Sequence, residues 1–291
     1  MTARGSYIIA LLLLFAPCTL LTAQESDEVG VWSDIGIEKA ITKRWNVGLD
    51  LEYRAQNKSR FSAGLSTSYK LFKGLKLGIG YNFLETRRPE KRKEKNEGEA
   101  YVDDEWTEGY NITPEYWYPR HRFSTEATGS IKLWKWLKVS LRERYQLTHC
   151  KARSVTKQKY RTQHVKEVDF DDDWNEIITY AEYPTYTEEL VEKPALTDQV
   201  LRSRIKLEMD KKKCHFSPFL SAEFHNSVGV GDHMLLQKIR TAAGCGYRFR
   251  KRHEVSLSYL LTFYMYDIED NEVVRQDERR HAISLGYKYS F

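Results

Sequence analysis

Residues 45–55 read WNVGLDLEYRA, and this stretch decides the fold. Every second residue from Trp45 to Ala55 is apolar. The residues between them are polar, charged or glycine: Asn46, Gly48, Asp50, Glu52 and Arg54. Successive side chains of a strand point to opposite faces, so a period of two gathers the apolar residues on one side. We predict a β-strand with one apolar face and one charged face.

The same alternation recurs along the chain. It defines ten predicted strands, at 45–55, 61–71, 75–83, 121–133, 137–147, 199–209, 215–225, 236–249, 253–265 and 279–291. No helical period competes with it, and repeated alternating runs favour an all-β fold. We predict a transmembrane antiparallel up-and-down β-barrel of 10–12 strands.

Residues 29–41 also alternate, and a tight turn joins them to the strand at 45–55. Counting them gives eleven strands, whereas bacterial single-chain barrels have an even number. Two placements remain open. Either the segment lies in or across the lumen, or a loop contains a twelfth strand.

The connections between the predicted strands alternate in length. Short links rich in Lys and Arg lie at 42–44, 72–76, 134–138, 210–214 and 250–253. The other connections lie at 56–59, 86–120, 148–198, 226–235 and 266–278. Short turns at one end and longer loops at the other are typical of outer-membrane barrels, with turns in the periplasm and loops outside the cell.

The overall composition is polar, with 30% charged residues and a mean hydropathy of −0.63. A soluble protein is the simple interpretation. However, barrel strands expose only alternate residues to lipid and therefore look polar on average. Residues 1–23 have a basic start, an apolar run and a small residue before Gln24, which predicts a signal peptide. The barrel domain then covers 24–291.

Aromatic residues lie near both ends of the predicted strands, which is typical of the two membrane interfaces. A secreted lipocalin-like barrel would alternate similarly. The chain ends in SLGYKYSF, and its terminal Phe291 resembles the signal by which bacterial barrels reach their assembly machinery. This end favours the outer membrane, with its lipids and the barrel-assembly machinery as partners.

Several runs also carry a family resemblance. They are ITKRWNVGLDLEYR, LRSRIKLEMD, FSPFLSAEFHN, LQKIRTAAGCGYRF, VSLSYLLTFY and HAISLGYKYSF. Together they resemble the Bacteroidetes outer-membrane β-barrel family known as domain of unknown function 2490. The resemblance implies an outer-membrane protein and offers no catalytic residue to carry over. The chain departs from the family in its two long charged loops.

The inward faces of the predicted strands carry many charges. They form a predicted lumen network of Asp50, Glu52, Arg54, Glu126, Arg142, Arg144, Arg202, Arg204, Glu208, Glu223 and Arg240. Interlocking arginines and carboxylates predict a structural plug, because unpaired buried charges are costly. A porin-like narrow passage for small anionic or polar solutes is the other interpretation. The leading function is thus a narrow or plugged channel, or a structural barrel.

The two longest loops share a motif, DDEWTE at 103–108 and DDDWNE at 171–176. Each loop begins basic and finishes acidic. Opposite charges on paired strands attract, so each loop is predicted to fold back as a hairpin. Solvated loops without a fixed partner are the alternative. The second function hypothesis is a surface module in which these acidic loops bind an extracellular ligand or cation, for instance Ca²⁺ at Asp169, Asp171 and Asp173, although the EF-hand glycine and distal glutamate are missing.

Catalysis has one weak signal. Ser221, Glu223 and His225 share a strand face, as an outer-membrane hydrolase would require. Ser221 and His225 lie about 13 Å apart at about 3.3 Å per residue, which exceeds hydrogen-bond reach. His121, His149 and Cys150 suggest a soft-metal site or isolated surface residues. We expect no enzyme, no cofactor and no nucleic-acid partner, since the net charge is only +5 and the basic residues are dispersed.

Overall fold

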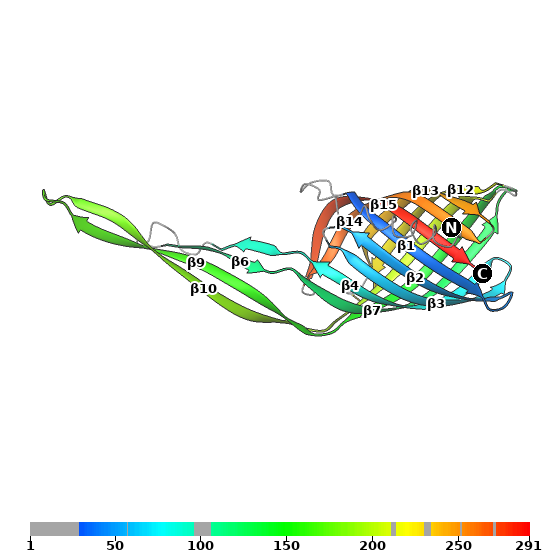
Figure 1. Cartoon of the computed structure of the whole chain (residues 1–291), viewed down its shortest axis with the longest axis horizontal. Helices are drawn as coiled ribbons and strands as arrows, with labels where there is room; N and C mark the ends of the chain where they lie inside the picture. The colour runs from blue at the N-terminus through cyan, green and yellow to red at the C-terminus, as the bar shows by residue number, and fades with distance from the viewer. Residues whose placement is uncertain are drawn as a thin grey trace, which may run out of the picture. The chain divides into compact units, whose positions relative to one another are not determined.

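The computed structural model describes residues 29–291 except 57, 96–105, 211–213, 230–233, 251 and 270–271 (Figure 1). The predicted signal peptide, 1–23, lies outside the described residues, as does the acidic start of the first motif, 103–105. The chain divides into two compact units. The barrel unit takes in the chain up to Thr86, Tyr118–Cys150 and Leu196–Phe291, and the hairpin unit takes in Arg87–Trp117 and Lys151–Ala195.

The barrel is closed and has eleven strands. They are β1 (Val29–Ala40), β2 (Trp45–Ala55), β3 (Arg60–Phe72), β4 (Leu75–Arg88), β7 (Tyr116–Lys132), β8 (Leu137–Cys150), β11 (Leu196–Met209), β12 (Phe216–Ser227), β13 (Leu235–Phe249), β14 (His253–Glu269) and β15 (Glu272–Ser290). Around the barrel their order is β1-β15-β14-β13-β12-β11-β8-β7-β4-β3-β2. The predicted all-β barrel is confirmed, and the strand predicted at 45–55 matches β2 at both ends.

The closure contains one parallel seam. β1 runs antiparallel to β2 and parallel to β15, in register from Val29 opposite His281 to Glu38 opposite Ser290. Both placements proposed for 29–41 are therefore wrong, because this segment is itself a barrel strand and the described residues add no twelfth. An odd number of alternating strands closes only if one neighbouring pair is parallel, so the even-number rule fails here.

The loop predicted at 266–278 is also wrong. β14 continues to Glu269 and β15 begins at Glu272, with Tyr266 opposite Arg275 and Glu269 opposite Glu272. The sequence pattern fades in this region because two valines are adjacent at 273–274, while residues 269–272 and 275–278 are all polar. The ladder does not need apolar side chains, since the backbone groups of the two strands satisfy each other.

The outward face of the barrel is apolar and exposed. In the middle of the strands, Leu65 is 57% exposed, Ile79 61% and Leu220 59%. All three occupy the strand positions that alternate with the charged inward ones. Among the described residues, no helix has the length and apolar character needed to span a bilayer.

Aromatic rings gather at both ends of this face. We call the end at which β1 joins β2 the turn end, and the opposite end the loop end. At the turn end, the ring centres of Phe216 and Tyr247 lie 4.9 Å apart. Further ring contacts connect Tyr247 with Phe249, Phe249 with His253, and His253 with Tyr289. At the loop end, Tyr53 lies opposite Phe61 and Tyr81 lies 5.2 Å from Phe123. The strand ends thus carry two aromatic belts.

The hairpin unit is a four-stranded sheet with the order β10-β9-β6-β5. Its strands are β5 (Lys91–Glu94), β6 (Trp106–Thr113), β9 (Arg153–Phe170) and β10 (Glu176–Lys193). β9 and β10 pair from Phe170 opposite Glu176 to Arg153 opposite Lys193. The Lys159 ammonium lies 2.9 Å from the Glu189 carboxylate, which pairs the basic arm with the acidic arm. The predicted fold-back is confirmed, and loops without a fixed partner are excluded for these strands.

Candidate functional site

The candidate site is the barrel lumen. Cross-strand register places Arg202 opposite Arg144 and Arg204 opposite Arg142, which makes a ladder of four guanidiniums on β8 and β11. The inward position is dictated by the strand period, since every apolar neighbour of these arginines turns outward. The ladder needs carboxylates nearby, because like charges in register repel one another.

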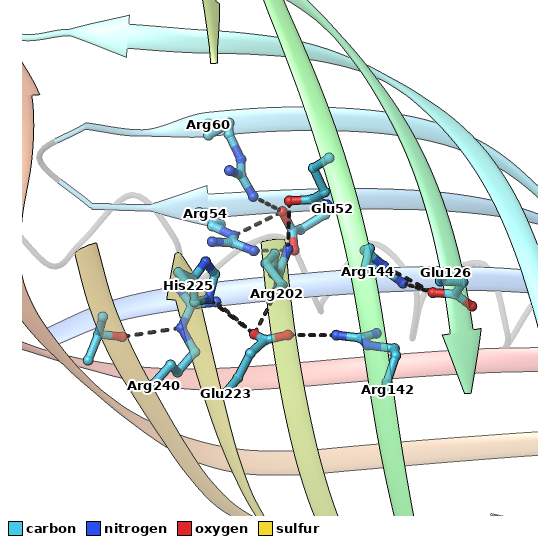
Figure 2. Close-up of polar contacts among 12 residues, drawn as sticks. Glu52, Arg54, Arg60, Glu126, Arg142, Arg144, Arg202, Glu223, His225 and Arg240 are labelled. Atoms are coloured by element: carbon cyan, nitrogen blue, oxygen red, sulfur yellow. Dashed lines mark hydrogen bonds and ion pairs between the residues drawn. The ribbon is translucent and has the colours of Figure 1, made fainter. Parts of the chain in front are cut away.

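Glu223 on β12 supplies the main counter-charge. Its carboxylate accepts a 2.7 Å hydrogen bond from Arg142 and another of 2.7 Å from Arg202 (Figure 2). Arg240 lies 4.0 Å away and the Nε2 atom of His225 3.3 Å away. The Glu223 side chain is only 7% exposed. One carboxylate therefore shares the charge of three guanidiniums, which leaves this cluster positive.

A second cluster forms around Glu52 on β2. Arg54 donates to both carboxylate oxygens, at 2.9 and 2.7 Å, and Arg60 donates to one at 2.6 Å (Figure 2). The Arg54 guanidinium also lies 3.7 Å from the ring centre of Trp32, and Arg240 lies 4.7 Å from the same ring. Trp32 thus connects the Glu52 cluster with the Glu223 cluster through cation–π contacts.

The remaining predicted network residues are only partly brought together. Arg144 donates to Glu126 at 3.0 and 2.5 Å, and Glu208 lies 3.3 Å from Lys206. Asp50 and Arg204 make no hydrogen bond or ion pair with a residue that the structure describes. Both lie in the wall of the cavity.

Sequence reasoning missed several lumen residues, among them Trp32, Asp34, Glu38 and Arg60. Trp32 lies in 29–41, the segment for which no place in the barrel was assigned. Arg60 lies one residue before the strand predicted at 61–71, although its even number matches the inward positions of β3. Extending the alternating pattern of this strand by one residue would have identified Arg60 as an inward residue.

A cavity of about 450 Å³ lies inside the barrel beside these clusters. Its wall includes many inward residues with small side chains, namely Gly36, Gly48, Ser62, Ser66, Ser68, Gly80 and Ser124. Most belong to β2, β3 and β4, so the space opens along these strands. An apolar cluster of Trp32, Leu260 and Ala282 fills another part of the interior, at β1, β14 and β15. The lumen is therefore partly filled and partly open.

The other chemical hypotheses find little geometric support. Ser221 lies opposite Lys206 and Ala242 in the sheet, and the described contacts do not join it to His225. His121 shares a hydrogen bond of 2.7 Å with Tyr81, and His149 one of 2.9 Å with Thr197. Within the described residues, no group of three or more His, Cys, Asp or Glu side chains is placed to hold a metal ion.

The acidic tip of the hairpin unit uses its carboxylates locally. Asp171 accepts hydrogen bonds from the backbone N–H groups of Asp173 and Asn175, at 2.9 and 2.8 Å. The Asn175 side chain donates a third at 2.9 Å. These donors, the Asn175 side chain first, lower the pKa of Asp171 below its usual 3.8. The carboxylate expected to bind a cation is therefore committed to a turn.

Comparison with protein families gives one match. The model of the family described as "Protein of unknown function (DUF2490)" matches residues 29–273. The chain belongs to this family. The match confirms the family resemblance seen in the sequence, and it begins with β1, the strand that completes the barrel.

Two solved structures are similar to this member of the family. The CymD monoaromatic hydrocarbon channel is 11% identical with a TM-score of 0.39, over 87% of each chain. The translocator domain of autotransporter NalP from Neisseria meningitidis is 9% identical with a TM-score of 0.31, over 99% of this chain and 97% of that one. No curated protein matches the sequence.

Proposed function

We propose that the protein is an integral outer-membrane barrel with a narrow passage for small polar solutes. One observation carries this proposal: a charged cavity of about 450 Å³ lies inside a closed barrel whose outward face is apolar. The passage is narrow because the ion-pair clusters fill part of the same interior. A passage through a membrane accounts for both the polar lumen and the apolar exterior.

The apolar exterior supports the membrane location. Exposed aliphatic residues such as Leu65, Ile79 and Leu257 lie between the two aromatic belts. In water each would forgo about 25 cal/mol for every Å² of apolar surface left unburied. In a bilayer the aliphatic band meets hydrocarbon and the belts meet the two interfaces. The longer connections then lie outside the cell and the short turns in the periplasm.

The last strand supports assembly in the outer membrane. β15 ends at Ser290, and the backbone of Phe291 bonds to β1, donating to Glu38 at 3.0 Å and accepting from Ala40 at 3.1 Å. We propose that this strand, with its terminal aromatic residue, is recognised by the barrel-assembly machinery before β1 completes the closure. Purified protein that stays dispersed in buffer without detergent would contradict the membrane proposal.

Conductance across a planar bilayer tests the passage. We expect the purified full chain to give discrete current steps in salt solution, and Arg142→Ala or Arg204→Ala to change their size or ion selectivity. Arg92→Ala in the hairpin unit, where the side chain pairs with Glu94 at 2.9 Å, is the matched control and should leave the current unchanged. A wild-type chain that folds and inserts but conducts no more than a protein-free bilayer would overturn the proposal.

A second candidate function is a binding surface on the hairpin unit. One face of its sheet carries two groups of rings in contact: the Trp106 and His164 rings stack with their centres 4.5 Å apart, and the Tyr160 ring lies 4.9 Å from the rings of Tyr110 and Tyr186. Rings of this kind offer flat apolar area to an extracellular ligand. Deleting residues 154–192 should then abolish surface binding and leave conductance intact. Equal binding by the shortened chain would exclude this function.

A further inference from the structure

We propose that the lumen cavity binds a small zwitterion, with the ammonium group at one wall and the carboxylate at the opposite wall. This inference rests on the proposed passage and specifies the solute class that it takes. It derives from three features of the cavity: the sign of the charges on each wall, the pairing of each charge, and the space between the walls.

The two charged walls lie on opposite sides of the barrel. The acidic wall carries four carboxylates, Asp34 and Glu38 on β1 with Asp50 and Glu52 on β2, and two cations, Arg54 on β2 and Lys288 on β15. The cationic wall consists of Arg142 and Arg144 on β8 with Arg202 and Arg204 on β11. In the closed order of eleven strands, β11 is five strands from β1 in one direction and five from β2 in the other. A solute in the cavity therefore experiences a transverse electric field.

Most of these charges already have partners. On the acidic wall, Glu52 is held by Arg54 and Arg60, and Glu38 pairs with Lys288 and accepts a 3.0 Å hydrogen bond from Asn46. The cationic wall is similar, because Glu223 accepts from Arg142 and Arg202 while Glu126 pairs with Arg144. Only a few groups on each wall remain available to a solute.

The available groups are Asp34 and Asp50 on one wall and Arg204 on the other. Asp50 and Arg204 make no hydrogen bond or ion pair in the described chain, and Asp34 makes a single long one of 3.5 Å with Ser284. Both aspartates are exposed although they point inward, so their exposure is to the cavity. The Nε atom of Arg204 is buried without a hydrogen-bond partner. Each wall thus presents unsatisfied charge of one sign.

Glycine makes room for the aspartates. A Cβ atom at Gly36 would lie 3.1 Å from an Asp50 carboxylate oxygen, and one at Gly286 would lie 2.7 Å from Asp34. The two carboxylates therefore lie directly over bare backbone, and the space in front of them stays open. The cavity, at about 450 Å³, falls within the range of small-molecule sites, about 300 to 1,000 Å³. An amino acid or a dipeptide has suitable dimensions.

The opposed charges favour a zwitterion over a simple ion. A monoanion attracted by Arg204 would be repelled by Asp34 and Asp50. A monocation attracted by the two aspartates would be repelled by Arg204. A solute with an ammonium and a carboxylate satisfies both walls at once. Each charge-assisted contact is expected to contribute at least about tenfold in affinity.

Three matched probes test this inference. They are the dipeptide Ala-Ala, its N-acetyl form, which is only an anion, and its amide, which is only a cation. Binding of each to the purified full chain in detergent is measured by equilibrium dialysis, and flux is measured by swelling of proteoliposomes. We expect Ala-Ala to bind at least about tenfold more tightly than either single-charge form, because it makes both contacts.

Variants assign each end of the solute to a wall. Asp50→Asn should weaken Ala-Ala and the amide about tenfold and leave the acetyl form bound no less tightly, whereas Arg204→Gln should weaken Ala-Ala and the acetyl form about tenfold and leave the amide bound no less tightly. Asp34→Asn is a second acidic-wall variant if Asp50→Asn does not fold. Asp210→Asn, at the turn end where it pairs with Lys132 at 2.5 Å, is the matched control and should change none of the three.

The outcomes separate this inference from the passage itself. Equal binding of Ala-Ala and its acetyl form, or unchanged Ala-Ala binding in Asp50→Asn and Asp34→Asn, would overturn the zwitterion site while conductance still supports the passage. Selective binding without swelling would overturn the passage and leave the binding site intact.

Discussion

Glu223 shows how single residues set the character of the lumen. It does not pair with Arg204, its direct neighbour in register, but with Arg202 and with Arg142 two strands away. Long arginine side chains make this reach available. The sequence predicted which charges point inward, because that depends only on the strand period. It did not predict which arginine pairs with which carboxylate, because that pairing depends on the register between strands that are distant in the chain.

Removing the Glu223 charge should destabilise the barrel. In Glu223→Gln, Arg142 and Arg202 lose a counter-charge that is only 7% exposed, and breaking a buried pair costs about 3 kcal/mol or more. We expect a lower midpoint in heat-modifiability gels and a more anion-selective current. Glu208→Gln is the control, because Glu208 is 22% exposed and its contact with Lys206 is 3.3 Å long. Equal midpoints for both variants would contradict this role of Glu223.

At the scale of elements, β1 carries the main structural surprise. Its alternation was visible in the sequence, and so was its turn to β2. Its pairing with β15 was not, because the two strands are at opposite ends of the chain and nothing local specifies their partnership. Closure decides it: a strand left outside the ladder would leave unpaired backbone groups at two edges, which a bilayer does not tolerate.

A cross-link tests the parallel seam. Ile35 lies opposite Tyr287, so Ile35→Cys with Tyr287→Cys, in a chain without native cysteines, should form a disulfide on oxidation. The control pair is Ile35→Cys with Val255→Cys, since Val255 lies opposite Tyr287 on the next strand. Two strand spacings make about 9.6 Å, beyond the limit of about 7 Å for a disulfide. Gel mobility with and without reductant distinguishes them, and cross-linking in the control alone would exclude the seam.

The tip of the β9–β10 hairpin should respond to acid. The pKa of Asp171 is lowered from its usual 3.8 by the Asn175 side chain and the backbone donors of Asn175 and Asp173. A depressed pKa means that the carboxylate stabilises the turn at any pH above 3.8 and that this contribution is lost as the pH falls through the lower, folded value. The NMR chemical shifts of the Asp173 and Asn175 backbone amides should therefore stay constant as the pH falls to the pKa of Asp171 in the folded protein, and should change below it. Asp171→Asn should abolish the transition, and a transition centred above pH 3.8 would contradict the hydrogen-bonded turn.

At the scale of the whole molecule, the chain combines two units with different chemistry. The barrel unit has an apolar exterior and a charged interior, whereas the hairpin unit is a sheet with charges and rings on exposed faces. The barrel strands were predictable because lipid-facing and lumen-facing positions alternate strictly. The β6–β9 pairing, in register from Trp106 opposite His164 to Ile112 opposite Gln158, was not predictable, because it joins two loops that the sequence presents as separate.

The barrel unit should fold without the hairpin unit. If Arg87–Trp117 and Lys151–Ala195 are each replaced by a short Asn-Gly turn, we expect the heat-modifiable mobility and the conductance to be retained, because all eleven barrel strands remain and only β4 and β7 lose two residues each. Deleting Val29–Ala40 is the contrasting control and should abolish folding, since it removes one strand and leaves two edges. A hairpin-deleted chain that fails to fold would show that the two units depend on each other.

The odd strand count also separates the ends of the molecule. β1 begins at the loop end with Val29, and β15 leads to Phe291 at the turn end. An even-stranded barrel returns its chain to the side from which it started, but this one does not. In the proposed outer-membrane orientation, an epitope placed before Val29 and another placed after Phe291 would therefore face different compartments, and antibodies added to intact cells would reach only the first.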